Sequence, residues 1–265
     1  MSVPSSISVP LRPVSQDVDM NKKLRLTVFL QKAQEAAEAH ATLYGCGYNQ
    51  LIQKDIVWVL SRIHLKIERF PLWLEPVRLD TWHKRVERIF ALRDFLLYAD
   101  EHGQEVWTGE EALAQNLRPV VRATSAWLLM DIRSRRMQRV EHFLPDLIDV
   151  DIPQDAIESL PDKLVAPEHL ERSHIHTVRF SDLDLNQHVN NTKYVEWALD
   201  CLPLDVLTKN QLRECQINYN HEALPQDQIS LYLASLPCEQ GPAFYVEGRR
   251  DTQNIFQCQF SFSHT

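Results

Sequence analysis

The ten residues 182–191 bring together polar side chains that suit chemistry on a small polar group. Two are carboxylates, one is an imidazole and four are amides. Groups of this kind are costly to bury unless each has a hydrogen-bonding partner. A site that binds and polarises a small polar substrate supplies such partners, so this segment is our candidate functional site.

Three of these side chains alternate in the sequence. Asp184, Asn186 and His188 are spaced two residues apart, and in an extended segment this spacing points all three to one side. A helix-like run follows at 191–201, and Asn190 or the asparagine after it suits the N-cap. Free backbone N–H groups at a helix start favour negative charge, so an ester or thioester carbonyl placed there would be polarised. His188 suits proton transfer near neutral pH.

The same residues also have a purely structural interpretation. Paired asparagines before a helix are ordinary capping residues, and Asp-Leu-Asp is an ordinary turn sequence. A comparison within the chain favours a functional site. An equivalent junction is expected between a strand at 24–29 and a helix at 31–44, and residues 26–31 there contain no Asp, Asn or His. If capping alone required the cluster, both junctions should contain it.

The order of expected elements occurs twice in the chain, which indicates an internal repeat. Each copy is a strand, a helix and then several long strands with alternating apolar residues. In the first copy the later strands are expected at 56–69, 77–86, 90–100 and 124–132, with a hairpin turn at 100–104. In the second copy a strand at 174–180 precedes the helix at 191–201, and strands follow at 216–221, 229–236, 243–250 and 256–262. Residues 63–72 align with 215–224, and 77–82 with 229–234, at one offset of 152.

This pattern predicts an α+β fold in which each copy wraps an antiparallel sheet around one central helix, a double hot-dog. The alanines of the first helix suit close contact with an enclosing sheet. We expect an N-terminal domain at 20–140, a linker at 141–171 and a C-terminal domain at 172–265. The linker has nine acidic residues and four prolines, so it is not expected to form a core strand. A short helical insertion is expected at 109–122.

Composition excludes several other classes of protein. No apolar run is long enough to span a membrane, and residues 1–18 lack the apolar core of a secretory signal. The five cysteines are scattered and form no C-x-x-C pair, so neither a disulfide framework nor a zinc site is expected. The six glycines form no phosphate-binding loop. We therefore expect a cytoplasmic protein with no cofactor and no metal.

The charge is unevenly distributed. Residues 1–140 carry a net charge of +4 and residues 141–265 carry −12, which together give the −8 of the chain. A nucleic-acid-binding protein usually has a strong basic stripe, so nucleic acid is not an expected partner. The densest basic cluster suits either an acidic protein partner or a solvated hairpin turn, and it consists of Arg133, Arg135, Arg136 and Arg139.

Several motifs in one order resemble the acyl-acyl-carrier-protein thioesterases of the plant plastid and bacterial type. In the second half, the motif is the segment Asp182–Tyr194. In the first half, the similar segments are Trp58–Pro71, Ala123–Met130 and Arg133–Arg136. The resemblance covers roughly residues 24–264. It implies a double hot-dog that hydrolyses the thioester of a fatty acyl chain on acyl carrier protein, with the acyl chain held in the N-terminal domain.

By this resemblance the catalytic groups of the family correspond to Asp184, Asn186, His188 and Glu222. Many plant members have a cysteine after the glutamate, where this sequence has Ala223. The nearby Cys215 is eight residues too early, and the repeat places it opposite a core-strand position. We therefore expect Cys215 to pack in the core and expect no cysteine nucleophile.

Several alternatives stay open at this stage. Glu222 or His188 is the base that activates water, or a carboxylate attacks the carbonyl and forms an anhydride. The rival functions are an acyl-CoA thioesterase of the same fold, a catalytically silent acyl-binding protein and a hydratase. The missing plastid transit sequence favours a bacterial protein, and a homodimer is left open.

Overall fold

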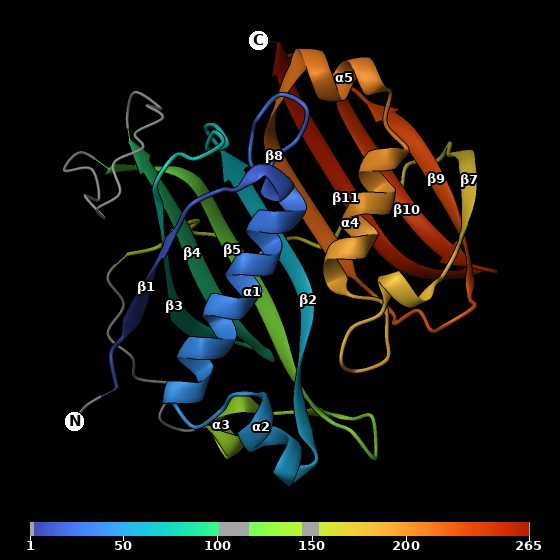
Figure 1. Ribbon diagram of the computed structural model, residues 1–265. Coiled ribbons are helices and arrows are strands. Elements are labelled where there is room, and N and C mark those ends of the chain that lie inside the picture. The colour runs from blue at the N-terminus through green and yellow to red at the C-terminus, as the bar shows by residue number, and fades with distance from the viewer. Residues whose placement is uncertain (1–2, 101–116, 145–153, 265) are drawn as a thin grey trace. The chain divides into compact units, whose positions relative to one another are not determined.

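The computed structural model describes residues 3–100, 117–144 and 154–264 (Figure 1). The chain divides into two compact units. The first comprises residues 1–61 and 67–161, and the second comprises residues 62–66 and 162–265. Among the described residues, no helix is both long and apolar enough to cross a membrane.

The first unit has a sheet with the strand order β1-β3-β4-β5-β2, and β6 pairs with β5. A long central helix, α1, lies across this sheet (Figure 1). The strands are β1 (Ser6–Leu11), β2 (Ile56–Ile67), β3 (Val77–Glu87), β4 (Phe90–Asp100), β5 (Leu117–Asp131) and β6 (Met137–Gln138). The helices are α1 (Leu26–Leu43), α2 (Tyr48–Leu51) and α3 (Val140–Phe143).

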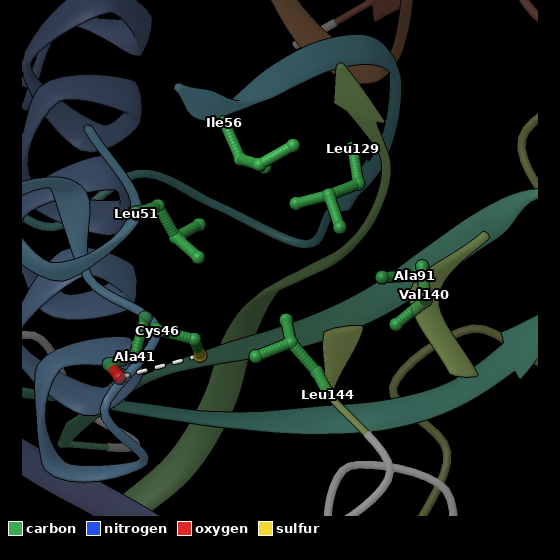
Figure 2. Close-up of a cluster of buried hydrophobic side chains, with 8 residues drawn as sticks. All are labelled: Ala41, Cys46, Leu51, Ile56, Ala91, Leu129, Val140 and Leu144. Atoms are coloured by element: carbon green, nitrogen blue, oxygen red, sulfur yellow. Dashed lines mark hydrogen bonds between the residues drawn. The ribbon is translucent and has the colours of Figure 1, made fainter. Parts of the chain in front are cut away.

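Small side chains let α1 approach the sheet closely. Ala33, Ala36, Ala37 and Ala41 are all buried on this helix, which agrees with the expectation for a helix that a sheet encloses. One end of α1 contributes to a hydrophobic cluster shown in Figure 2. The cluster consists of Ala41, Cys46, Leu51, Ile56, Ala91, Leu129, Val140 and Leu144.

The second unit repeats this design. Its strand order is β8-β11-β10-β9-β7, and residues 62–66 pair with the outer side of β8. The strands are β7 (Glu171–Thr177), β8 (Asn210–Tyr219), β9 (Gln228–Leu236), β10 (Ala243–Arg250) and β11 (Gln253–His264). The helices are α4 (Asn191–Asp200) and α5 (Leu204–Lys209), and α4 packs on β10 and β11.

One strand was predicted wrongly, and two strands, β1 and the short β6, were missed. The segment expected as a strand at 24–29 contains the start of α1 at Leu26, and the first strand is β1. All five residues 26–30 are buried, so the alternation of residue types there carried no information about which side faces the core. The later strands of the first copy lie within a few residues of the predicted limits, except that β5 begins at Leu117.

Two other predictions fall partly outside the described residues. The helical insertion expected at 109–122 is wrong for residues 117–122, which belong to β5, and 109–116 lie outside the described part. Most of the predicted turn at 100–104 also lies outside it.

The predicted linker at 141–171 is divided between the units. It begins within α3, and residues 145–153 lie outside the described part. In the first unit, Ala156 N–H donates to the buried Asp94 carboxylate at 2.7 Å. In the second, Leu164 N–H donates to Asn218 Oδ1 at 2.6 Å. The described linker residues 154–170 contain no strand. Side chains of the two units hold their backbone in place of a neighbouring strand.

Candidate active site

Residues 182–190 form a tight turn between β7 and α4. Asp184 N–H donates to the His188 carbonyl at 2.9 Å, and Gln187 N–H donates to the Asp184 carbonyl at 3.1 Å. Gln187 adopts a left-handed backbone, with φ of 64°. The expectation of an extended segment was therefore wrong. The chain reverses direction, so alternation along the sequence does not place Asp184, Asn186 and His188 on one side.

The Asp184 carboxylate holds this turn in shape. Its Oδ1 accepts the backbone N–H of Asn186 at 2.8 Å, the local bond of an Asx turn. Asn186 itself is exposed near the tip of the turn. Asp184 thus has a definite structural role beside any part it has in chemistry.

The structure brings His188 and Glu222 together from segments far apart in the sequence. His188 Nδ1 lies 3.5 Å from Glu222 Oε2, and about a third of each side chain is exposed, 35% and 36%. The backbone beside Glu222 is anchored at two points. Val189 N–H donates to the Ala223 carbonyl at 3.0 Å, and Ala223 N–H donates to the Tyr194 hydroxyl oxygen at 3.0 Å. This partly exposed imidazole–carboxylate pair is suited to proton transfer with water.

The pKa of Tyr194 is raised by its surroundings in the site. Burial raises the pKa of its phenol, and the carboxylates of Glu222 and Asp184 raise this pKa further. Tyr194 therefore remains a neutral phenol at neutral pH. The carboxylates of Glu222 and Asp184 thus both act on the same phenol.

The start of α4 is capped by Asn190, which decides between the two asparagines that the sequence left open. Asn190 Oδ1 accepts the backbone N–H of Thr192 at 2.9 Å and its hydroxyl at 2.7 Å. The cap occupies the donor of Thr192. Within the described residues, the structure records no acceptor for the backbone N–H of Asn191.

Sequence reasoning treated Asp182 as part of one polar cluster and missed its partner, His176. The Asp182 side chain is almost fully buried and accepts a hydrogen bond from Arg179 N–H at 2.7 Å. Its Oδ2 also lies 3.0 Å from His176 Nε2. The sequence shows a histidine in the predicted strand just before the cluster, but the spacing between His176 and Asp182 is not typical of any motif.

The four arginines considered for docking are exposed and surround the hairpin between β5 and β6. Arg133 forms an ion pair with Asp55 at 2.7 Å. Arg135 has a left-handed backbone at the turn, with φ of 57°. Arg139 is the residue before α3. The geometry fits a hairpin turn in solvent, and it also presents positive charge on one surface of the first unit.

Cys215 lies in β8 and has no exposed surface. Burial raises the pKa of its thiol, so the prediction of a packing position is confirmed. Among the described residues, the structure contains no group of three or more His, Cys, Asp or Glu side chains arranged to hold a metal ion.

The first unit contains a loop of the same shape before α1. Asp19 N–H donates to the Lys23 carbonyl at 2.8 Å, and Asp19 Oδ1 accepts Asn21 N–H at 2.8 Å. Leu24 N–H donates to the Pro71 carbonyl at 2.8 Å. The first copy therefore does contain Asp and Asn before its helix, contrary to the prediction, because the misplaced strand put the predicted junction several residues too late.

Comparison with known families identifies both units. The acyl-ACP thioesterase N-terminal domain matches residues 12–148, and the acyl-ACP thioesterase C-terminal domain matches residues 166–264. The chain belongs to the acyl-ACP thioesterase family. The family resemblance stated from sequence motifs is thus confirmed, and the candidate active site lies within the C-terminal domain of this family.

Individual relatives agree with this membership. The chain is 29% identical over 78% of its length to the chloroplastic palmitoyl-acyl carrier protein thioesterase of Gossypium hirsutum. It is 28% identical over 80% of its length to the chloroplastic oleoyl-acyl carrier protein thioesterase of Coriandrum sativum. These matches span only 50% and 58% of the two relatives' own lengths.

Solved structures confirm the predicted fold. An acyl-ACP thioesterase from Bacteroides thetaiotaomicron VPI-5482 is similar with a TM-score of 0.81 and 23% identity, over 98% of both chains. The 12:0-ACP thioesterase from Umbellularia californica gives 0.77 and 22%, over 98% of this chain and 94% of the other. The family member is therefore an α+β double hot-dog.

Proposed function

We propose that this family member hydrolyses the thioester of a fatty acyl chain carried by acyl carrier protein, releasing the free fatty acid and ending chain extension. The observation that carries the proposal is the pair of His188 and Glu222, 3.5 Å apart, beside the start of α4. The names of the relatives support the choice of substrate.

In the proposed reaction the thioester carbonyl docks near the start of α4. The N–H of Asn191 and the side chain of Asn186 are the donors proposed to position and polarise it, and one such donor contributes about 3–4 kcal/mol to the transition state. Glu222 or His188 removes a proton from water, which attacks the carbonyl carbon. The thiol of the carrier leaves with a proton, and Asp184 maintains the turn that holds His188.

A covalent route is the alternative mechanism. In that route a carboxylate attacks the carbonyl, the thiol leaves, and water then hydrolyses the anhydride. Single-turnover hydrolysis in heavy-oxygen water tests for the covalent route. Label found in the Glu222 or Asp184 carboxylate supports the anhydride, whereas label in the fatty acid alone arises both from direct attack by water and from attack of water on the acyl carbonyl of the anhydride.

The activity test uses acyl carrier proteins loaded with chains of different length. Thiol and free fatty acid should appear in equal amounts. Preferential turnover of acyl-CoA in a competition assay would show that the substrate is carried by coenzyme A and not by acyl carrier protein. Consumption of enoyl chains without thiol release would indicate a hydratase. Binding of acyl chains without turnover would indicate a silent acyl-binding protein.

The proposed docking surface for the acidic carrier is the hairpin between β5 and β6. Reversing the charge of Arg135 and Arg136 to Glu should slow association, more strongly at low ionic strength, because exposed charges act over about 10 Å in 0.1 M salt. The control reverses Lys163 and Arg172, two exposed residues of the second unit, and changes the net charge equally. Equal slowing in both variants would place docking elsewhere.

We also propose that the acyl chain lies in the first unit, where a mostly apolar cavity beside α1 is lined by Ala37, Trp58 and Trp127 among others. Replacing Ala37 with Leu should shift the preference toward shorter chains. The control is Ala39→Leu, which changes an exposed residue of the same helix. An unchanged chain-length profile in Ala37→Leu would contradict this location.

The bacterial cytoplasm is the proposed location, and a homodimer is the proposed assembly. The five free cysteines, four of them buried, support a reducing compartment. Fractionation of the native host tests the location. Light scattering of the purified protein tests the assembly.

A further inference from the structure

His176 contacts two residues that hold the candidate catalytic turn in place, Asp182 and Trp197. Its Nε2 lies 3.0 Å from Asp182 Oδ2. Its ring stacks on the indole of Trp197, with centroids 4.1 Å apart and planes inclined by 30°. Trp197 is buried in α4, so His176 connects the helix to the beginning of the turn.

Asp182 closes the base of the turn. Its carboxylate accepts Arg179 N–H from the preceding segment, and its backbone carbonyl accepts Asn190 N–H at 2.8 Å. Asn190 is also the cap of α4. The two arms of the turn therefore meet at Asp182, and a side chain that restrains Asp182 restrains the arm that carries His188.

The first unit shows that the base closes without a histidine. Asp17 Oδ2 accepts Val14 N–H at 2.9 Å, and the Asp17 carbonyl accepts Arg25 N–H at 3.0 Å. Asp17, Val14 and Arg25 thus correspond to Asp182, Arg179 and Asn190. With the same spacing along the chain, Leu11 corresponds to His176. The strand register agrees.

Leu11 pairs with Val77, and His176 pairs with Ile229, the residue that the repeat aligns with Val77. The same turn therefore forms around an aspartate without a histidine. The imidazole is present in the copy that contains His188 and Glu222.

We propose that His176 is a positioning residue for thioester hydrolysis, which restrains Asp182 and so keeps His188 aligned with Glu222. The inference rests on the proposed function. A hydrogen bond to a carboxylate is among the stronger kinds, and the stack on Trp197 fixes the ring that donates it. Because His176 acts through Asp182, its loss should change kcat and leave KM almost unaltered.

Two variants separate the two contacts of His176. His176→Phe keeps a ring against Trp197 but removes the donor to Asp182. His176→Gln keeps an N–H donor but removes the ring. The matched control is His174→Phe, which changes an exposed histidine of the same strand.

We expect kcat to fall about tenfold in His176→Phe, since small displacements of reacting groups have large effects on rate. KM and the thermal midpoint should remain close to those of the wild type. His176→Gln should recover most of the rate, and His174→Phe should match the wild type.

An unchanged kcat in His176→Phe overturns the positioning role while the function stands, provided that the wild type and His174→Phe are active. Failure of Gln to restore the rate, or a loss of rate matched by a loss of thermal stability, also overturns it. An inactive wild type rejects the proposed function itself, and the positioning role with it.

Discussion

The turn before α4 and the turn before α1 have the same backbone but different chemistry. In both, an aspartate side chain accepts the backbone N–H of an asparagine two residues later. Asp184 accepts from Asn186, and Asp19 accepts from Asn21. In both, the same residue of the turn has a left-handed backbone. The polar side chains of residues 182–190 thus serve largely to form the turn and cap α4.

Several of the differences between the two turns bear on the proposed chemistry. The first unit has Lys23 where the second has His188, and Phe70 where the second has Glu222. It also has Phe29 and Pro71 where the second has Tyr194 and Ala223. This last exchange is physically consistent. Proline has no N–H, so the first unit needs no hydroxyl to accept one, whereas Ala223 N–H donates to Tyr194. The comparison separates residues that shape the turn from residues that are present only where chemistry is proposed.

The largest expected effect comes from the residues unique to the second unit. Replacing Glu222 with Gln, or His188 with the Lys of the first unit, should lower kcat by about 10²–10⁴-fold through loss of acid–base catalysis. Steady-state hydrolysis of acyl carrier protein substrates measures the loss, and circular dichroism verifies the fold. Near-normal turnover in Glu222→Gln would remove the proposed base and reduce the comparison to two structural turns.

An intermediate effect should separate shape from chemistry. Asp184→Ala and Asp19→Ala both remove the hydrogen bond to the asparagine two residues later, and Asp19→Ala also removes the bond from Lys23 N–H at 2.9 Å. Both should lower the thermal midpoint, Asp19→Ala at least as much as Asp184→Ala. Only Asp184→Ala should also reduce kcat, by up to about 10²-fold, because the displaced turn carries His188. Equal activity in the two variants would mean that the alignment of His188 does not depend on this turn.

The exchange of Tyr194 and Ala223 gives a smaller effect. Tyr194→Phe leaves the buried N–H of Ala223 without its acceptor, which should cost about 1–3 kcal/mol of unfolding free energy. The double variant Tyr194→Phe/Ala223→Pro recreates the pair Phe29 and Pro71 and should regain part of the loss. Chemical denaturation measures both. A double variant less stable than Tyr194→Phe would show that the two positions are not equivalent.

The smallest effect on catalysis is expected at Cys215. Cys215→Ala should retain the kcat of the wild type, because this thiol is buried in β8 and its pKa is raised by burial. Loss of activity with unchanged stability would restore a cysteine mechanism. The Cys215→Ala variant also serves as a control for a small change in the core of the second unit.

Much of the fold was predictable because its signals are local. The strand β3 alternates at its start, and the repeat offset of 152 linked the later strands of the two copies. The start of α1 was not predictable in this way. Residues 26–30 are buried throughout, so no face of the helix is distinguished by polarity in the sequence.

The candidate site divides in the same manner. The sequence alone indicated Asp184, Asn186 and His188 as a polar group before a helix, because capping and turn residues act within a few positions of one another. It placed Glu222 only through the family resemblance, and it did not identify His176.

The sequence by itself therefore determined the repeated strand-and-helix order, the capped start of α4 and the family. Only the tertiary structure decided which polar side chains meet. The approach of Glu222 to His188, and of His176 to Asp182 and Trp197, depends on β7, α4 and the segment after β8 packing together. Contacts between distant segments leave no regular spacing in the chain, so they emerge only when the sheet closes on its helix.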